Sequence, residues 1–188
     1  MSTNTESKPI AEEYNPVAKR LTIEEIKHVT GERTIPLTGV QNDAKVFTTE
    51  TGEDFSRVAL VAALLNIEDI SKSTAPFYNG KLADPTGAII INAGQYQPEA
   101  SAIMGQLRDE IDTTGMPILV TVIGKPAVYK PADGTPLMNL RVETIRPANP
   151  ATQQLFLEEL KTRLGERLEK NQLSPEIVAK YTEVMQKL

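Results

Sequence analysis

The sequence predicts a small closed β-barrel of five strands, with one helix between the third and fourth strands and further helices after the last strand. Residues 57–147 alternate between apolar or β-branched runs and turn sequences in that order. Asp84-Pro85-Thr86-Gly87 carries the residues that a type I turn favours and joins two strands as a hairpin. Gly80 and Gly124 lie within strands, where a small barrel needs bends. Five strands in this order indicate an OB-fold, a Greek-key barrel.

The segment before the barrel falls into two parts. Residues 1–16 are rich in Ser, Thr, Glu and Pro and are interpreted as a disordered tail. Thr22 and Glu25 have the spacing of a capping box, which predicts a helix that runs to about Val29 and ends at Thr30-Gly31. Residues 31–54 hold turn formers and few apolar residues. We therefore predict an N-terminal helix and a connecting segment over 17–54.

The barrel is predicted over residues 55–147. Its elements are Arg57 to Asn66, Phe77 to Ala83, Ala88 to Ala93, a helix from Pro98 to about Ile111, Ile118 to Ile123 with a second extended piece from Pro126 to Lys130, and Met138 to Pro147. In the last strand, Leu140, Val142 and Thr144 share one face, and Asn139, Arg141 and Glu143 share the other. A ferredoxin-like fold would need a helix after the first strand, and Asn66 to Ala75 is too short and polar to form one.

Residues 148–188 are predicted to be helical. The helix from Pro150 to about Lys170 places Phe156, Leu160, Leu164 and Leu168 in one stripe. A second helix starts at Ser174-Pro175, a cap followed by proline at the first helical position. Its apolar face carries Ile177, Tyr181, Val184 and Leu188.

Composition excludes several kinds of site. The sequence has no cysteine and one histidine, His28. Disulfides, thiol nucleophiles, iron–sulfur clusters and cysteine-ligated zinc are therefore excluded. His28 has no motif around it and is interpreted as structural. No calcium-loop spacing, phosphate-binding glycine loop or paired-carboxylate motif is present. We expect a protein that is not an enzyme and that uses no metal or cofactor.

The net charge of −5 argues against a strongly basic nucleic-acid clamp but permits a local basic patch. Residues 53–147 hold 8 Lys and Arg against 11 Asp and Glu. Phosphate neutralisation supplies essentially all of non-specific affinity, so we expect the barrel alone to bind single strands weakly unless its cations cluster. The polar N-terminus and the short apolar run from Val58 to Leu65 lead us to expect a soluble intracellular protein without membrane contact.

Several segments resemble the archaeal replication protein A family, and more narrowly its small OB-fold members, the replication protein A-associated proteins. The matching segments are Arg57 to Glu68, Phe77 to Ala100, Val122 to Tyr129 and Leu140 to Ile145, with Val17 to Arg20 and Pro36 to Gly39 upstream. The turn at Asp84 to Gly87, followed by Ala93 to Ala100, is the most specific part. The resemblance spans roughly residues 14–165, so the last helix lies beyond it.

The resemblance implies a subunit of a hetero-oligomeric single-stranded DNA-binding complex used in DNA replication, repair and recombination. Such a subunit would be cytoplasmic and associated with the nucleoid. Larger subunits of the family often carry a zinc finger, and the absence of cysteine fits a small subunit.

Alternate residues of a strand project from the same face, and this alternation identifies candidates for nucleic-acid contact. OB-folds bind single strands through aromatic stacking and through cations along a groove. Phe77 and Lys81 share a face of the second strand with Asn79, and Lys125 and Tyr129 share parity with Thr121 in the fourth. The candidates are Arg57, Phe77, Lys81, Tyr96, Lys125, Tyr129 and Arg141. Each has a plain alternative: Phe77 can belong to the core, Tyr96 can cap the barrel end, and isolated cations are usually only solvated.

The stripe of Phe156, Leu160, Leu164 and Leu168 must be buried against something. It packs either on its own barrel or second helix, or against a larger subunit. The second alternative is favoured here, because replication protein A complexes are generally held together by helical bundles. Two other functions remain open: an OB-fold adaptor that binds no DNA and recruits replication or repair proteins, and an OB-fold that acts on RNA or tRNA.

Overall fold

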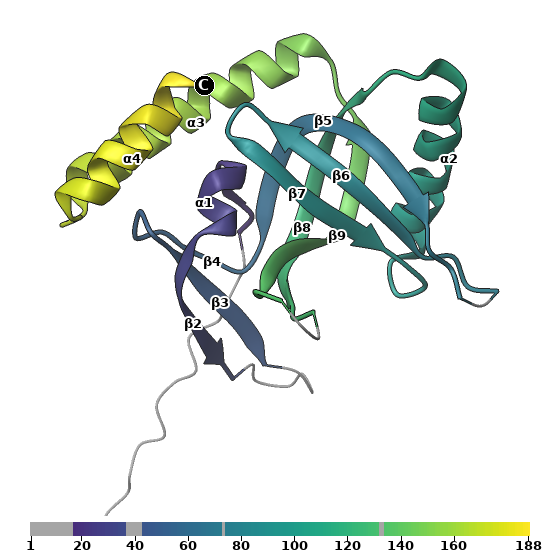
Figure 1. The fold of residues 1–188 in the computed structure, drawn as a ribbon, viewed down its shortest axis with the longest axis horizontal. Helices are drawn as coiled ribbons and strands as arrows, with labels where there is room; N and C mark the ends of the chain where they lie inside the picture. Colours follow the sequence, from purple (N-terminus) through teal and green to yellow (C-terminus); the bar gives the residue numbers. More distant parts are fainter. Residues whose placement is uncertain (1–16, 37–42, 73, 132–133) are drawn as a thin grey trace, which may run out of the picture.

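The computed structural model describes residues 17–36, 43–72, 74–131 and 134–188. The predicted tail and most of the segment Pro36 to Gly39 lie outside these ranges. In the described chain, five strands close into a barrel (Figure 1). They are β5 (Val58–Asp69), β6 (Tyr78–Asp84), β7 (Gly87–Ala93), β8 (Ile118–Tyr129) and β9 (Leu137–Pro147), with helix α2 (Pro98–Thr114) between β7 and β8.

The order of the strands identifies the barrel as an OB-fold. They follow the order β5-β6-β7-β9-β8, and β8 pairs back onto β5 to close the sheet. The β7–β9 pair is parallel and the other pairs of the barrel are antiparallel. This is the predicted Greek-key connection, with the helix in the predicted place, so the fold class is confirmed.

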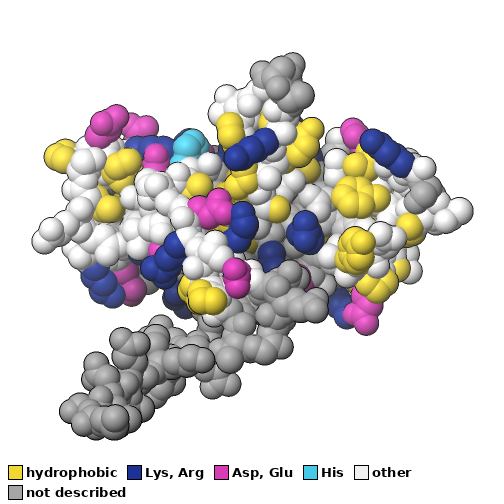
Figure 2. Space-filling view, turned by 90° about the horizontal axis from the view of Figure 1, so that it is seen from below, with side chains coloured by type: hydrophobic (Ala, Val, Ile, Leu, Met, Phe, Trp, Pro, Cys, Tyr) yellow, Lys and Arg dark blue, Asp and Glu magenta, His cyan; other side chains and the backbone are white. Residues whose placement is uncertain are grey.

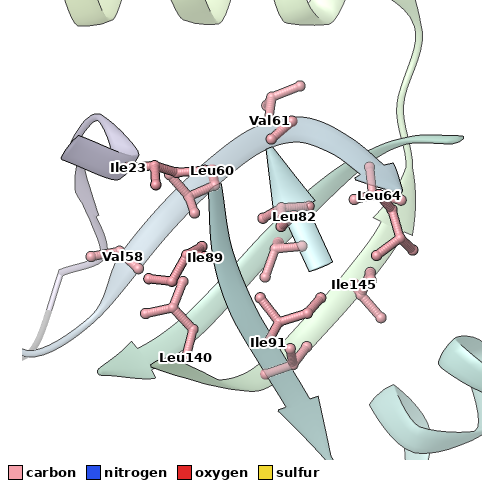
Figure 3. Packing of buried hydrophobic residues seen from close by; sticks show 14 of the residues in the cluster. Ile23, Val58, Leu60, Val61, Leu64, Leu82, Ile89, Ile91, Leu140 and Ile145 are labelled. Carbon is pink, nitrogen blue, oxygen red and sulfur yellow. The ribbon is translucent and has the colours of Figure 1, made fainter. Parts of the chain in front are cut away.

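Strand β5 is apolar along most of its length because both of its faces are covered. Leu60 and Leu64 point into the barrel with Leu82 and Ile91, whereas Val61 points outward towards helix α3 (Pro150–Lys170) (Figure 3). A strand buried on both faces has no polar side to alternate with its apolar side.

The hairpin between β6 and β7 also caps a helix. Asp84 pairs with Gly87 across the turn, and the Asp84 carboxylate accepts the backbone N–H of Thr86 at 2.7 Å and of Gly87 at 3.0 Å. Its other oxygen accepts the N–H of Ile23, at 2.9 Å. The predicted turn is therefore present, and it docks helix α1 (Ile23–Lys27) onto the barrel.

Helix α1 has the predicted capping box between Thr22 and Glu25. It ends at Lys27, earlier than predicted, because Val29 already belongs to the next strand. Ile23 and Ile26 are fully buried in the same core as the barrel side chains. Figure 1 shows α1 on one side of the barrel and α2 on the other.

The predicted connecting segment is in fact a small antiparallel sheet. It consists of β2 (Val29–Ile35), β3 (Ala44–Thr49) and β4 (Asp54–Phe55), in that order. Strand β2 is exposed along nearly its whole length, so its sequence shows no apolar alternation. Backbone pairing with β3 and burial of Phe47 and Phe55 hold the sheet, and neither is a local signal.

A β-bulge in β9 overturns one predicted face. Val142 pairs with Gly124 and Thr144 pairs with Ile123, which leaves Glu143 as an extra residue. The parity shifts there, so Ile145 is buried and Thr144 is exposed, contrary to the predicted face. Gly124 is needed at this point, because a Cβ would lie 2.8 Å from the carbonyl oxygen of Arg141.

The C-terminal helices α3 and α4 (Pro175–Gln186) are confirmed, and the structure shows what the apolar stripe contacts within this chain. Phe156 and Leu160 join the barrel core, while Leu164 packs with Tyr181 and Val184 and the half-buried Leu168 lies against them. The stripe is therefore buried within its own chain, which is the intramolecular alternative. Its predicted role in subunit assembly stays a prediction.

Candidate functional site

The outer face of β6, β7, β9 and β8 presents side chains in rows that run across the strands. Register places Asn79, Asn92, Arg141 and Lys125 side by side in one row. Lys81, Ile90, Asn139 and Ala127 form the next row. Paired residues of neighbouring strands project from the same side of a sheet, so the predicted parity of Lys81, Lys125 and Arg141 is confirmed.

Two adjoining hollows lie at the end of the first row. One, of about 590 Å³, is lined by Ile70, Lys72, Phe77, Asn92, Tyr96 and Arg141 among others. The other, of about 500 Å³, is lined by Tyr96, Glu99, Lys125, Arg141 and Glu143 among others. Because both share Tyr96, Gln97 and Arg141, they form one surface, which we call the groove.

The groove lies where the β5–β6 loop and the β7–α2 connection meet the sheet, at the lower right of Figure 1. Seen from below, Lys and Arg side chains lie across the middle of the surface, and hydrophobic side chains gather to their right (Figure 2). The lining of the groove holds both kinds of side chain, since it includes Ile70 and Phe77 as well as Lys125 and Arg141.

Phe77 is positioned by the loop that precedes it. Its backbone N–H donates to the Ser71 hydroxyl at 2.8 Å, and its carbonyl accepts the N–H of Ile70 at 2.9 Å. Hydrogen bonds from Ser71 to Asp69 hold the pKa of the Asp69 carboxyl below its usual value, so this loop anchor stays ionised. The ring is 41% exposed and lies over Gly94, where a Cβ would come within 2.5 Å of it.

Tyr96 projects from the tight turn between β7 and α2. The N–H of Gln97 donates to the carbonyl of Gly94 at 2.9 Å, which closes the turn. The Tyr96 side chain is 85% exposed, so it does not cap the barrel end as the plain alternative supposed. Both predicted rings thus offer an exposed surface to the groove.

The cations of the face differ in how free they are. Glu143, the bulge residue, accepts a hydrogen bond from Arg57 Nε at 2.6 Å and forms an ion pair with Lys125 at 3.3 Å. Within the described ranges, no carboxylate lies within ion-pair distance of Arg141 or Lys81. Arg141 is therefore an unpaired cation inside the groove, and Lys81 is an unpaired cation in the row beside it.

The structure brings four of the predicted contact residues together: Phe77, Tyr96, Lys125 and Arg141. Arg57 joins them through Glu143, whereas Lys81 and Tyr129 do not line the groove. Tyr129 pairs with Leu137 at the far end of β8 and is 57% exposed. Sequence reasoning missed Lys72 and Ile70, and their place in the loop between the first two barrel strands was the signal that could have found them.

The rest of the described molecule offers little chemistry of other kinds. In the part of the chain that the structure describes, no three His, Asp or Glu side chains cluster closely enough to hold a metal ion. None of the described helices is both long and apolar enough to cross a bilayer. With its proton on Nδ1, the His28 ring donates a hydrogen bond to the carbonyl oxygen of Glu24, at 3.0 Å, and it also faces the Glu24 carboxylate.

No family model and no curated protein matches this sequence. Among solved structures, the chain is similar to the second single-stranded DNA-binding protein of Mycobacterium smegmatis, with 14% identity, 50% of this chain and 86% of that chain covered, and a TM-score of 0.37. It is similar to yeast Stn1 and Ten1, with 11% identity, coverages of 73% and 67%, and a TM-score of 0.42. It is also similar to Rim1, a mitochondrial single-stranded DNA-binding protein of S. cerevisiae, with 18% identity, coverages of 51% and 96%, and a TM-score of 0.32.

Proposed function

We propose that this protein binds single-stranded DNA in the groove and serves as a small subunit of a replication protein A-like complex in DNA replication, repair and recombination. The observation that carries the proposal is the junction of the two hollows at Arg141. There an unpaired guanidinium of the fifth barrel strand lines the same surface as two exposed aromatic rings, which come from the segment just before the second strand and the connection just after the third. This is the face on which OB-folds bind oligonucleotides.

Each side chain has a distinct role in this proposal. Phe77 and Tyr96 stack on bases, an interaction worth about 1–3 kcal/mol per base. Arg141 and Lys81 neutralise phosphates of the DNA. Lys125 does so once its ion pair with Glu143 has opened and a DNA phosphate has replaced the carboxylate. The resemblance of Arg57 to Glu68 and of Phe77 to Ala100 to the replication protein A family supports the wider role in a complex.

The test is fluorescence anisotropy of a labelled single-stranded DNA of about 16 nucleotides, titrated at low and moderate salt. We expect salt-sensitive, saturable binding that Arg141→Ala weakens about 10-fold, equivalent to about 1.4 kcal/mol. Tyr96→Ala should weaken it by about 1–3 kcal/mol, since one base loses its stacking partner.

Arg146→Ala is the matched control, because Arg146 is an exposed arginine on the same strand that does not line the groove. It should leave the affinity nearly unchanged. Equal effects of Arg141→Ala and Arg146→Ala would show that only general charge matters and would remove the groove from the proposal. Tighter binding of RNA than of DNA of equal sequence would reassign the substrate.

A second function is favoured by the carboxylate of Glu143. It lies in the groove and engages both Arg57 and Lys125, so a phosphate has to compete with it. An OB-fold adaptor that recruits replication or repair proteins without touching DNA would tolerate such a carboxylate. Absence of single-strand binding at low salt would select this function.

A further inference from the structure

Two further strands lie beyond Lys125 around the closed barrel. Beyond Lys125 on β8 the next strand is β5, where Val58 pairs with Gly124, and the next is the short strand β1 (Lys19–Arg20), where Lys19 pairs with Val58. The N–H of Lys19 donates to the carbonyl of Arg57 at 2.9 Å. Two strand spacings, about 10 Å, therefore separate the Lys125 strand from the Lys19 strand.

Beside β1 lies another hollow, polar and of about 220 Å³, between β1, the turn before β4, and α3. We call it the basic pocket. Its cationic lining residues are Lys19, Arg20, Arg163, Arg167 and Lys170. Arg167 is buried, and its Nε and Nη2 donate to Glu25, so it forms the floor of the pocket and is not free to bind a ligand.

In the described part of the chain, the five cations of the basic pocket pair with only four carboxylates. Lys19 pairs with Glu53, Lys170 with Glu166 and Arg167 with Glu25. Arg20 and Arg163 share the same oxygen of Glu159, at 2.8 and 2.7 Å. Two guanidiniums thus share one carboxylate, and both are about half exposed. Their remaining N–H donors can bind a planar or tetrahedral oxyanion.

We propose that the basic pocket binds a backbone phosphate of the nucleic-acid strand that leaves the groove past Lys125 and Arg57. This inference rests on the proposed function, because it extends the path of the same strand. The ligand class is a phosphodiester without base readout: among the residues that the structure describes, none that lines the basic pocket is aromatic, so only the sugar-phosphate chain is held there. The bound strand is therefore longer than the groove alone would occupy.

The experiment compares three DNA ligands on the chain of 188 residues. One is a single strand of about 6 nucleotides, and the other two are the same strand with an abasic sugar-phosphate extension to about 16, attached at one end or at the other. For the unmodified protein, we expect one of the two extended ligands to bind more tightly, with a salt slope steeper by about 0.7 for each added phosphate contact. The double variant Arg20→Ala with Arg163→Ala should lose this gain and keep the affinity for the short strand.

Lys161→Ala with Lys187→Ala removes the same charge from exposed positions on α3 and beyond α4, outside the basic pocket, and should keep the gain. The inference is overturned if the extension gives no gain, or if both double variants lose it equally. Those results would leave short-strand binding in the groove intact. If none of the three ligands binds the unmodified protein at low salt, the proposed function fails and this inference fails with it.

Discussion

Glu25 is a fully buried ion that ties three parts of the chain together. Its carboxylate accepts hydrogen bonds from Thr22 in the capping box, from the Thr51 hydroxyl at 2.7 Å, and from both ends of the Arg167 guanidinium at 3.0 and 2.9 Å. Burying such a pair costs several kcal/mol of desolvation, which its hydrogen bonds offset. The pair therefore fixes where α3 lies more than it adds stability.

Removing one partner of this pair should be far worse than removing both. We expect Glu25→Ala to lower the free energy of unfolding by about 3–5 kcal/mol, because Arg167 is left buried without a counter-ion. Glu25→Leu combined with Arg167→Met should recover most of the loss in urea denaturation. As a control, Glu159→Ala removes a partly exposed carboxylate whose two arginine partners are about half exposed, and it should cost at most about 1 kcal/mol. A loss of similar size from Glu25→Ala would contradict this account.

Helix α4 is held to the small β2–β4 sheet by one carboxylate. Glu50 accepts hydrogen bonds from Lys180 Nζ at 2.7 Å and from the Tyr181 hydroxyl at 3.0 Å. Burial opposes ionisation of Glu50, but these two hydrogen bonds act the other way and leave its pKa below the ordinary 4.5. Burial, reinforced by the Glu50 charge, raises the pKa of Tyr181. The attachment of α4 is therefore strongest at pH values where the Glu50 carboxyl is ionised and the Tyr181 hydroxyl is still protonated.

This arrangement predicts how stability depends on pH. A lowered pKa means that the stabilisation by Glu50 is present above pH 4.5 and is lost as the pH falls through the folded-state value. The urea midpoint of the unmodified protein should exceed that of Glu50→Gln at neutral pH, and the difference should shrink on acidification. Glu183→Gln, at an exposed position of α4, should show no such trend. A difference between the unmodified protein and Glu50→Gln that does not change with pH would be the contrary result.

The molecule has one main hydrophobic core. The predicted domain boundaries at residues 55 and 147 would divide this core, because some of its residues lie outside them. Leu21, Ile23, Ile26 and Phe47 from the N-terminal part belong to the same buried cluster as the barrel strands. Phe156 and Leu160 of α3 complete it from the other end. The barrel is therefore covered by the segments on both sides of it in the sequence.

An isolated fragment of residues 55–147 should consequently be unstable. Full burial of each large apolar side chain contributes about 1.5–3 kcal/mol, and six are lost, against a typical domain stability of about 5–15 kcal/mol. We expect no cooperative thermal transition by circular dichroism for 55–147, and a single one for 17–188. A cooperative transition of the short fragment near that of the longer one would show that the barrel is an independent domain.

Local patterns identified most of the architecture correctly. The capping box at Thr22, the turn at Asp84 to Gly87 and the proline-started helices at Pro98 and Pro150 are short-range signals, and each element lies where it was predicted. The sheet β2–β4 was missed because an exposed strand carries no apolar alternation. The face of Thr144 was wrong because a bulge is a property of two paired strands, not of one.

The candidate site shows the same limit. Residue types and strand parity were enough to select Phe77, Tyr96, Lys125 and Arg141, since these depend on the strand that carries each side chain. Only the folded chain decides which cations lack a carboxylate partner, because Arg57 donates a hydrogen bond to Glu143, which lies 86 residues away in the sequence. In the same way, α3 meets the core and Glu25 only once the barrel is closed. The periodicity that predicts helices and strands depends on residues close together in the sequence. Ion pairs, bulges and the burial of a helix face depend on contacts between residues far apart in it.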